Sequence, residues 1–349
     1  MRGLALRGRN RLVVVTVTAA ALVAVIVAAG LASDGPSGDH EGPPAISPVP
    51  VPTSGAYFGT EFSSSVDRAA LVAEQERQLG RQFDIDHVYH PFDAVFPTPY
   101  DESTMEQGHI LFVSWTCRLE GGGAVHWGDI ASGKWDPVID ARARALGALG
   151  SPVLVSFCHE PGTFEGGDKS GSPSDYVAAW RHIAERFRSQ GVTNVAWVWT
   201  VTSYAFRQGG AAKYYPGDDV VSWVGVDGYV NVHCPWLNVG WASWRDVFGA
   251  ADAFAREHGK PLIVAEFTLA EDPAHPDHKR RWLEASLPEM RAMTQLRAVV
   301  AFNSVETCSS YIASSSEALA GYRMLGRSRY FTDRLPHPLP LASPSATPS

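Results

Sequence analysis

Short apolar or β-branched runs recur along this chain, and amphipathic stretches separate most of them. Near-continuous apolar strands that alternate with helices indicate a parallel sheet buried on both faces. Eight strands of this kind predict a closed barrel, so the expected fold class is α/β, a single (β/α)₈ TIM barrel. The eight runs cover residues 56–62, 87–92, 109–115, 152–157, 194–200, 221–229, 261–267 and 296–303.

The stretches between these runs have helical periodicity. In the segment 172–191, a Ser-Pro start signal precedes Tyr176 and Trp180, which lie one turn apart on the same helical face. The segment 278–293 is also amphipathic, but Pro288 is expected to interrupt it because proline lacks the backbone donor that a helix interior needs.

Composition divides the chain into four parts. Residues 1–33 contain arginines followed by about 20 uncharged apolar residues, which predicts either a cleaved signal peptide or an N-terminal membrane anchor. Residues 34–54 and 331–349 are rich in Pro, Gly and Ser, and predict an extended linker and a disordered tail. Residues 55–330 are expected to form the barrel domain. The chain is therefore expected outside the cell, either secreted or anchored at the outer face of the membrane.

Four cysteines in an exported chain are expected to be oxidised. Cys117 and Cys158 follow the third and fourth strands, which are neighbours in a barrel, and are expected to form one disulfide. Cys234 and Cys308 would then form the second, across the loops after the sixth and eighth strands.

In barrels of this kind, catalytic groups lie at the carboxyl ends of the strands. Aromatic rings stack on the apolar faces of sugars, while a pair of carboxylic acids acts at a glycosidic bond. The residues at the strand ends are therefore of the types that suit a carbohydrate: Glu61, Trp115, His159, Glu160, Trp199, Asp227, Tyr229 and Glu266. A glutamate at one such end can be a mere salt-bridge partner, but a second one in the equivalent place on the seventh strand disfavours that explanation.

Two other chemistries fit the fourth strand end poorly. His159 and Glu160 begin an HExxH zinc motif, but the second histidine is replaced by Thr163, and Pro161 opposes the required helix. A thiol nucleophile is also disfavoured, because Cys158 and its neighbouring histidine point to opposite faces of a strand. We therefore expect no metal site and no cofactor.

Four segments together resemble glycoside hydrolase family 26, in the same order and at similar spacing. The resemblance covers residues 130–303 well and 55–129 loosely. The segments are SGKWDPVIDARARALGALGSPVLVSFCHEPGTF (132–164), SDYVAAWRHIAERFRSQGVTNVAWVWT (174–200), YYPGDDVVSWVGVDGY (214–229) and KPLIVAEF (260–267).

The resemblance implies a retaining hydrolase of a β-linked polysaccharide built on a (β/α)₈ barrel. It implies that Glu160 is the acid/base and Glu266 the nucleophile. It further implies that His159 flanks the sugar at the cleavage point, that Tyr229 donates a hydrogen bond to the nucleophile, and that Trp199 is a platform for a sugar ring.

Trp115 and Trp236 are further aromatic candidates for sugar binding, whereas Asp227 is not assigned a catalytic role. The chain departs from the mannan-cleaving members of the family where those members hold the sugar. Pro161 and Gly162 stand where Met-Asn-Gly is usual, and Ser156 lies near the place of an arginine. The resemblance therefore leaves β-mannan, mixed-linkage β-glucan and β-xylan as candidate substrates.

The sequence thus predicts an endo-acting, monomeric glycoside hydrolase whose partner is a neutral polysaccharide or oligosaccharide. A net charge of −8 disfavours nucleic acid as a partner. The alternative is a catalytically inactive, wall-associated carbohydrate-binding protein on a barrel scaffold. The presence of both glutamates argues against that alternative, because a binding protein needs no paired acid and nucleophile.

Overall fold

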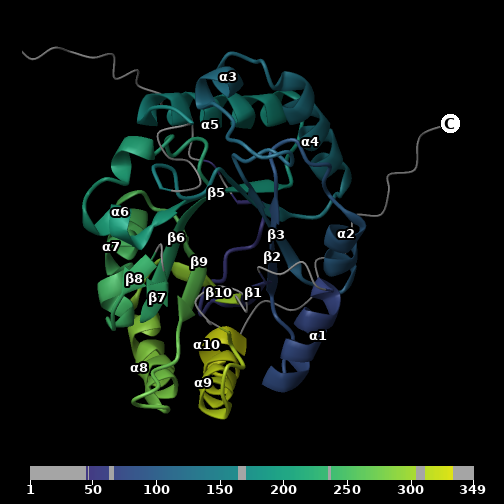
Figure 1. Ribbon diagram of the computed structural model, residues 1–349. Coiled ribbons are helices and arrows are strands. Elements are labelled where there is room, and N and C mark those ends of the chain that lie inside the picture. Colours follow the sequence, from purple (N-terminus) through teal and green to yellow (C-terminus); the bar gives the residue numbers. More distant parts are fainter. Residues whose placement is uncertain are drawn as a thin grey trace, which may run out of the picture. The chain divides into compact units, whose positions relative to one another are not determined.

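The computed structural model describes residues 45, 47–62, 67–163, 170–234, 237–303 and 311–332. Eight parallel strands close into a barrel, which confirms the expected fold class (Figure 1). Around the barrel, the strands neighbour one another in the order β1 (Tyr57–Phe62), β10 (Leu296–Asn303), β9 (Leu262–Leu269), β6 (Trp223–Val230), β5 (Val195–Thr202), β4 (Val153–Phe157), β3 (Ile110–Trp115) and β2 (Ile85–His90). All eight predicted runs are therefore strands.

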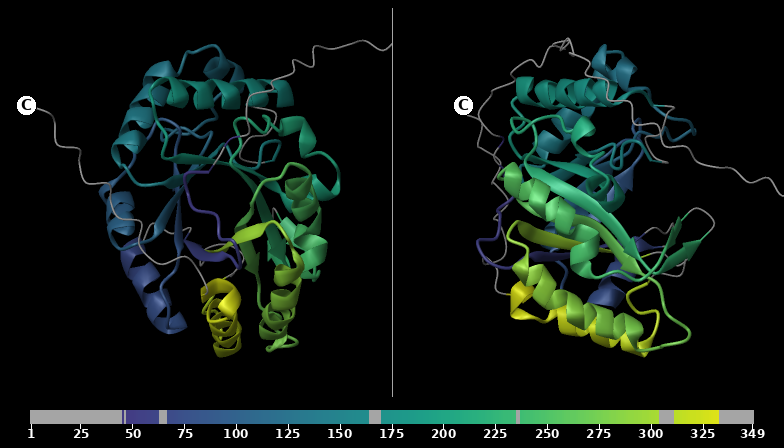
Figure 2. Two further views of the ribbon diagram at one scale, coloured as in Figure 1. Left: turned by 180° about the vertical axis from the view of Figure 1, so that it is seen from behind. Right: turned by 90° about the vertical axis from the view of Figure 1, so that its left-hand side faces the viewer.

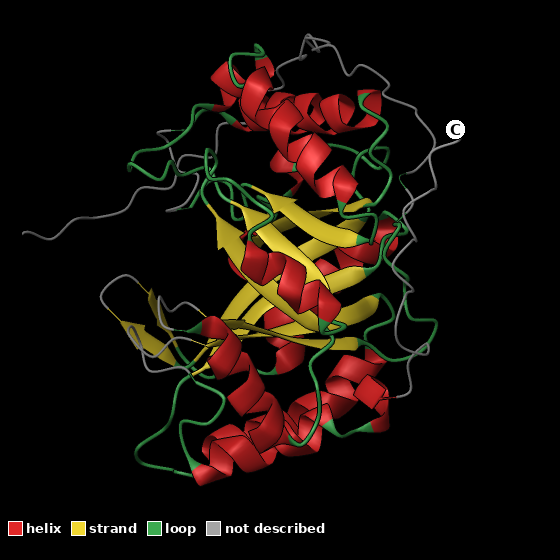
Figure 3. Cartoon of the chain, turned by 90° about the vertical axis from the view of Figure 1, so that its right-hand side faces the viewer, coloured by secondary structure: helices red, strands yellow, loops and turns green. Residues whose placement is uncertain are grey.

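Helices surround the barrel on its outside, as Figures 2 and 3 show from three further directions. Three of them, α2, α5 and α7, start with a capping box, at Thr98, Ser172 and Ser243. The helices are α1 (Arg68–Leu79), α2 (Pro99–Glu106), α3 (Trp127–Ala131), α4 (Asp136–Ala148), α5 (Pro173–Ser189), α6 (Ser203–Arg207), η1 (Ala212–Tyr214), α7 (Trp244–Glu257), α8 (His278–Ala292), α9 (Ser316–Gly326) and α10 (Arg329–Thr332). A short antiparallel pair, β7 (Val232–Cys234) and β8 (Leu237–Val239), follows β6.

The predicted interruption at Pro288 is wrong, because α8 runs through this residue without a break. Leu283 and Met290, one on each side of the proline, are both fully buried against the barrel. Packing on both sides of the proline therefore compensates for the hydrogen bond that it cannot donate.

The core has two layers. Inside the barrel, Ile85, Phe112, Leu154 and Trp223 belong to a compact apolar cluster from which solvent is excluded. A larger cluster lies between the outer face of the strands and the helices. Strands buried on both faces in this way carry apolar side chains toward both the interior and the helices, which explains the nearly continuous apolar runs of the sequence.

The described residues 47–54 are not the extended spacer that the sequence predicts. Val49 is 1% exposed and belongs to the interior cluster, while Ser47 Oγ accepts a hydrogen bond of 2.8 Å from Trp223 Nε1. Tyr57 Oη donates to the Pro50 carbonyl at 2.8 Å. This segment is part of the base of the barrel, because its few apolar side chains cover the end of the interior cluster.

The predicted boundary between residues 33 and 34 lies outside the described residues. Phe331, which the sequence assigns to the tail, is fully buried in α10 and is part of the folded domain. Within the described residues, no helix combines the length and the apolar composition that a membrane span requires.

Candidate active site

The inner wall of the barrel changes from apolar to polar toward the carboxyl ends of the strands. The first polar layer consists of buried side chains that pair across strands: His87 Nε2 lies 2.8 Å from Ser114 Oγ, and Ser156 Oγ donates to Thr200 Oγ1 at 3.0 Å. Beyond this layer lie the predicted strand-end acids. The polar groups thus gather at the end of the barrel where the sequence analysis expected the site.

Glu266 is brought to the inside of the barrel by an irregularity in β9. Val226 of β6 pairs with Val264, but the next residue, Asp227, pairs with Glu266, so β9 contains one extra residue. Such a bulge turns a side chain that regular alternation would point outward. As a result, Ala265 belongs to the interior cluster and Glu266 also faces inward.

Two tyrosine hydroxyls hold the Glu266 carboxylate. Tyr229 Oη donates to Oε2 and Tyr89 Oη donates to Oε1. Burial raises the pKa of both tyrosines well above the ordinary value, and the charge of Glu266 adds to this rise. Both phenols therefore remain protonated donors at neutral pH. The hydrogen bond from Tyr229 that the family resemblance implies is present, and Tyr89 provides a second one.

Glu160 lies on a sharp corner after β4, where the backbone takes a left-handed conformation twice. The φ angles are 48° at Cys158 and 52° at Glu160, values that non-glycine residues rarely adopt and that are often found at functional sites. The Glu160 N–H donates to the Thr200 carbonyl at 2.9 Å, which fixes the corner to β5.

The Pro161-Gly162 pair that follows is explained by crowding. Gly162 has a φ of 84°, and a Cβ atom there would lie 2.5 Å from the Tyr214 hydroxyl oxygen. No residue with a side chain fits this place without displacing Tyr214. The glycine at position 162 is thus required by an aromatic neighbour from η1.

A disulfide joins the corner to the neighbouring strand, as predicted. Cys117 and Cys158 are linked with an S–S distance of 2.01 Å and a Cα–Cα distance of 5.0 Å. The indole Nε1 of Trp127 contacts both sulfur atoms, at 3.3 and 3.2 Å. This link secures the backbone two residues before Glu160, where the left-handed conformation begins.

Two further acids surround the glutamates. Asp227 is 1% exposed, and neither of its carboxyl oxygens accepts a side-chain hydrogen bond within the described residues. Burial raises the pKa of Asp227 well above the ordinary value, and the charges of Glu266 and Glu160 raise it further. Glu61 is also fully buried, and burial raises its pKa well above the ordinary value although Arg68 Nη1 lies 3.7 Å from Oε1.

Glu160 and Glu266 both lie close to Asp227 and Tyr229. The charge of each glutamate raises the pKa values of these two side chains, and Tyr229 Oη also donates to Glu266 Oε2. The predicted residue His159 is 6% exposed, with its ring centroid 5.5 Å from that of Tyr89. The structure therefore brings together two glutamates in different surroundings, two phenols and an imidazole.

The predicted roles of Trp199 and Trp115 in sugar binding are wrong. Both side chains are fully buried in the layer between the strands and the helices. Trp199 packs against Phe254 of α7, with ring centroids 5.4 Å apart, and Trp115 stacks on Phe92 at 4.9 Å. Their strand positions alternate with inward-facing ones, so they point away from the mouth of the barrel.

The side chains of three other predicted residues lie outside the described part of the structure. They are Trp236, Cys234 and Cys308. The second disulfide and the contribution of Trp236 to substrate binding therefore remain predictions.

Tyr89 is the residue of the site that sequence reasoning missed. The second strand is Ile85–His90, two residues earlier than the predicted run 87–92. The earlier start includes Asp86, whose buried carboxylate pairs with Arg68 Nη2 at 2.6 Å. Asp86 weakens the apolar pattern at the start of the strand, so the predicted run began too late. His87 and Tyr89 lie two residues apart and therefore on the same face of the strand, which was the available sign that Tyr89 belongs to the site.

Part of the chain matches a sequence model of a known family, and several characterised proteins are similar to it. Residues 133–252 match Glycosyl hydrolase family 26. Endoglucanase H from Acetivibrio thermocellus is 31% identical over 279 residues, which are 77% of this chain and 30% of that protein. A β-1,3-xylanase from a Vibrio species is 30% identical over 158 residues, 42% of this chain and 32% of that protein. The chain spans about a third of the length of these curated relatives.

Solved structures with the same fold include two mannanases. A family 26 β-mannanase from Bacteroides ovatus has a TM-score of 0.60 and 18% identity, and the match covers 80% of this chain and 90% of that chain. The catalytic domain of an endo-β-1,4-mannanase from Bacillus sp. JAMB-750 has a TM-score of 0.63 and 16% identity, with 80% and 88% covered. At such identities the likeness shows the barrel fold.

Proposed function

Because the chain belongs to glycosyl hydrolase family 26, we propose that it is an endo-acting, retaining glycoside hydrolase of a neutral β-linked polysaccharide. The observation that supports the proposal is a pair of glutamates in different surroundings: two tyrosine hydroxyls hold Glu266 of β9, and Glu160 lies on a left-handed corner after β4 that is fixed to β5. Double displacement needs two carboxyl groups in different ionisation states, one protonated and one charged.

In the first step, the Glu266 carboxylate attacks the anomeric carbon while the bond to the leaving oxygen breaks. Glu160 donates its proton to that oxygen, and a covalent glycosyl-enzyme forms. In the second step, Glu160 accepts a proton from water, the water oxygen attacks the anomeric carbon, and Glu266 leaves. The raised pKa that an acid at Glu160 needs near neutral pH is a prediction.

The two phenols suit the role of Glu266. Hydrogen bonds from Tyr89 and Tyr229 hold both oxygens of its carboxyl group in position. We also propose that His159, whose ring packs beside that of Tyr89, contacts the sugar at the cleavage point.

The substrate class is a neutral β-linked polysaccharide: β-glucan, β-xylan or β-mannan. The relative that covers 77% of this chain is named an endoglucanase, a second one is named a β-1,3-xylanase, and structures of the same fold include mannanases. The residues around the site depart from the mannan-cleaving pattern, so mixed-linkage β-glucan is the first substrate to test. We further propose that the protein acts as a monomer outside the cell, after export through its N-terminal segment.

Incubation of the purified protein with β-glucans, xylans and mannans, followed by measurement of new reducing ends, tests the activity. We expect release of oligosaccharides from at least one polymer, with a rapid fall in viscosity because internal bonds are cut. NMR of the first product should show a retained anomeric configuration. A product with inverted anomeric configuration would refute the mechanism. If the protein binds a polymer but cleaves none of them, the result would support the carbohydrate-binding alternative.

A further inference from the structure

Three residues with metal-binding side chains lie together in the segment that connects β9 to α8. Asp272, His275 and His278 follow one another at intervals of three residues, just beyond the strand that carries Glu266. Their ligand atoms all lie within 4.8 Å of one another. No other group of three such side chains is this close within the described residues.

Two of the three distances between the donor atoms are close to those around a bound metal ion. Asp272 Oδ2 lies 3.2 Å from His275 Nδ1 and 3.0 Å from His278 Nδ1. A tetrahedral zinc ion with ligands at about 2.0–2.1 Å places neighbouring ligand atoms roughly 3.3 Å apart. The two histidine donor atoms lie within 4.8 Å of each other, so they need to approach by at most about 1.5 Å to share one ion.

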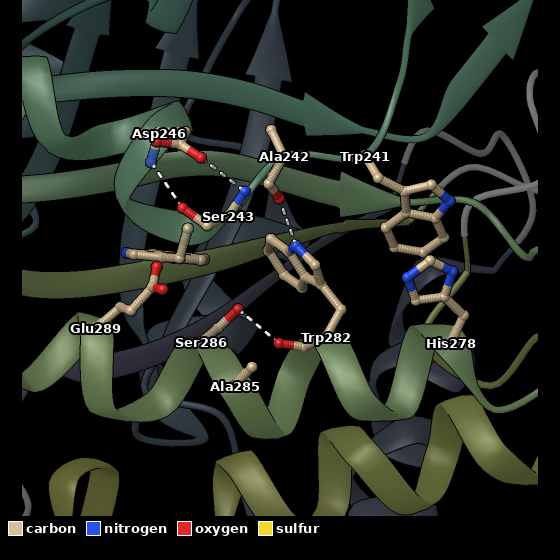
Figure 4. A pocket seen from close by; sticks show the side chains of 10 residues that line it. Trp241, Ala242, Ser243, Asp246, His278, Trp282, Ala285, Ser286 and Glu289 are labelled. Carbon is tan, nitrogen blue, oxygen red and sulfur yellow. Dashed lines mark hydrogen bonds between the residues drawn. The ribbon is translucent and has the colours of Figure 1, made fainter.

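The backbone and a neighbouring tryptophan hold this arrangement in place. The His275 N–H donates to the Asp272 carbonyl at 3.0 Å, and the His278 N–H donates to the His275 carbonyl at 2.9 Å. Asp272 Oδ1 accepts from the Ala274 N–H at 3.0 Å, which leaves Oδ2 for the histidines. The ring of His278 stacks on Trp241 with centroids 3.7 Å apart, and Figure 4 shows the two rings facing each other.

The three side chains are open to solvent. The Asp272 side chain is 17% exposed and the His275 side chain is 65% exposed, so an ion can reach them. Two imidazoles and one carboxylate are ligands that zinc accepts, with a water molecule in the fourth position.

We propose that Asp272, His275 and His278 form a structural binding site for a divalent transition metal ion, with Zn²⁺ as the preferred ion. The ion would tie the segment after β9 to the first turn of α8, and through His278 to Trp241. It takes no part in the proposed hydrolysis, so the proposal does not depend on the activity. The proposed site also differs from the expectation that the chain has no metal site, which was based only on the incomplete HExxH pattern.

Thermal unfolding of the untagged, chelator-treated protein tests the site. With zinc at a hundred times its dissociation constant, the unfolding midpoint should rise by about 5 °C, and calorimetry should show one ion per chain. Mg²⁺ should give no rise, because it prefers oxygen ligands. His275→Ala should abolish the zinc-dependent rise, as should Asp272→Asn.

His182→Ala is the matched control, because His182 also contacts a carboxylate, with Nε2 2.6 Å from Asp136 Oδ1, but belongs to no group of three ligands. The His182→Ala variant should show the same zinc-dependent rise in the unfolding midpoint as the wild type, even if its midpoint without zinc differs. The proposal is overturned if zinc leaves the wild-type midpoint unchanged, or if His275→Ala and Asp272→Asn respond to zinc as the wild type does. In either case the three residues are only a hydrogen-bonded cluster on the rim.

Discussion

The ends of β4 and β9 each present a glutamate to the mouth of the barrel, but they hold it by opposite means. At β9, Glu266 is 4% exposed, and two tyrosine hydroxyls bind its carboxylate. At β4, the constraint acts on the backbone: a left-handed corner, a disulfide and a bond to β5 fix the main chain at Glu160, whose side chain is partly exposed.

Under the proposed roles, the difference reflects which part of each residue must be fixed. A nucleophile attacks one carbon along one line, so its oxygens are held. An acid that becomes a base must exchange protons with the leaving group and then with water, so its side chain needs access to solvent while its backbone stays in place. The four predictions that follow test this contrast, in order of decreasing effect.

The largest effect is expected at the β9 end. Glu266→Ala removes the proposed nucleophile and should lower kcat on the polysaccharide by about 10⁴-fold or more. An unchanged unfolding midpoint would show that the loss is chemical. Glu185→Ala, at an exposed position on α5, is the control and should retain full activity. Residual turnover above a tenth of wild type would contradict the role of Glu266.

At the β4 end, the loss should depend on the substrate. Glu160→Ala should lower turnover of the polysaccharide by about 10²- to 10⁴-fold, because no group then protonates the leaving oxygen. An aryl glycoside whose phenol leaves without a proton should still form the glycosyl-enzyme at close to the wild-type rate. A burst of released phenol measures this step. Equal losses on both substrates would remove the distinction between the two glutamates.

The hydroxyls that hold Glu266 should have intermediate effects. Tyr89→Phe and Tyr229→Phe each remove one charge-assisted hydrogen bond and should lower kcat/KM by roughly 10- to 100-fold. The double variant should lose less than the product of the two factors, because both act on one carboxylate. Tyr204→Phe is the control, since Tyr204 is 65% exposed. Strict multiplication of the two effects would indicate independent roles.

The smallest effect concerns stability and pH. Folding raises the pKa of Asp227, so the folded state binds the proton more tightly than the unfolded state does. Stability is therefore lost as pH rises above about 3.9, the ordinary value for aspartate, until the pH exceeds the folded pKa. Asp227→Asn should avoid this loss and raise the unfolding midpoint by about 3 °C at pH 7 relative to wild type.

At pH 4, close to the ordinary pKa of aspartate, about half of the unfolded chains still carry the proton, so most of this advantage of Asp227→Asn should disappear. Unfolding curves of both proteins between pH 4 and pH 7 measure the difference. A constant gap at all pH values would show that Asp227 influences stability by packing and not by its charge.

The number of strands and the positions of the two glutamates could be predicted from the sequence, because both follow from chain order. Each glutamate ends an apolar run, and in a parallel barrel all such ends meet at one mouth. The direction of each side chain could not be predicted in the same way. Strands buried on both faces have no polar and apolar alternation, so Trp199 gave no sign that it faces the helices.

Two other features depend on contacts between distant parts of the chain. The bulge that turns Glu266 inward arises from the pairing of β9 with β6, which a single strand does not encode. The role of residues 47–54 as part of the base depends on Val49 reaching the interior cluster, and a Pro-rich composition conceals this. By contrast, the disulfide between Cys117 and Cys158 was predictable, because neighbouring strands follow from the barrel alone.

The interior cluster, which includes Val49 and Tyr57 at the base, fills the lower part of the barrel. The barrel is therefore closed at the base and open at the carboxyl ends of its strands. In the proposed reaction, a polysaccharide would therefore reach the two glutamates from the open end alone. Both fragments would leave by the same opening, so a fragment that dissociates slowly would delay binding of the next polysaccharide.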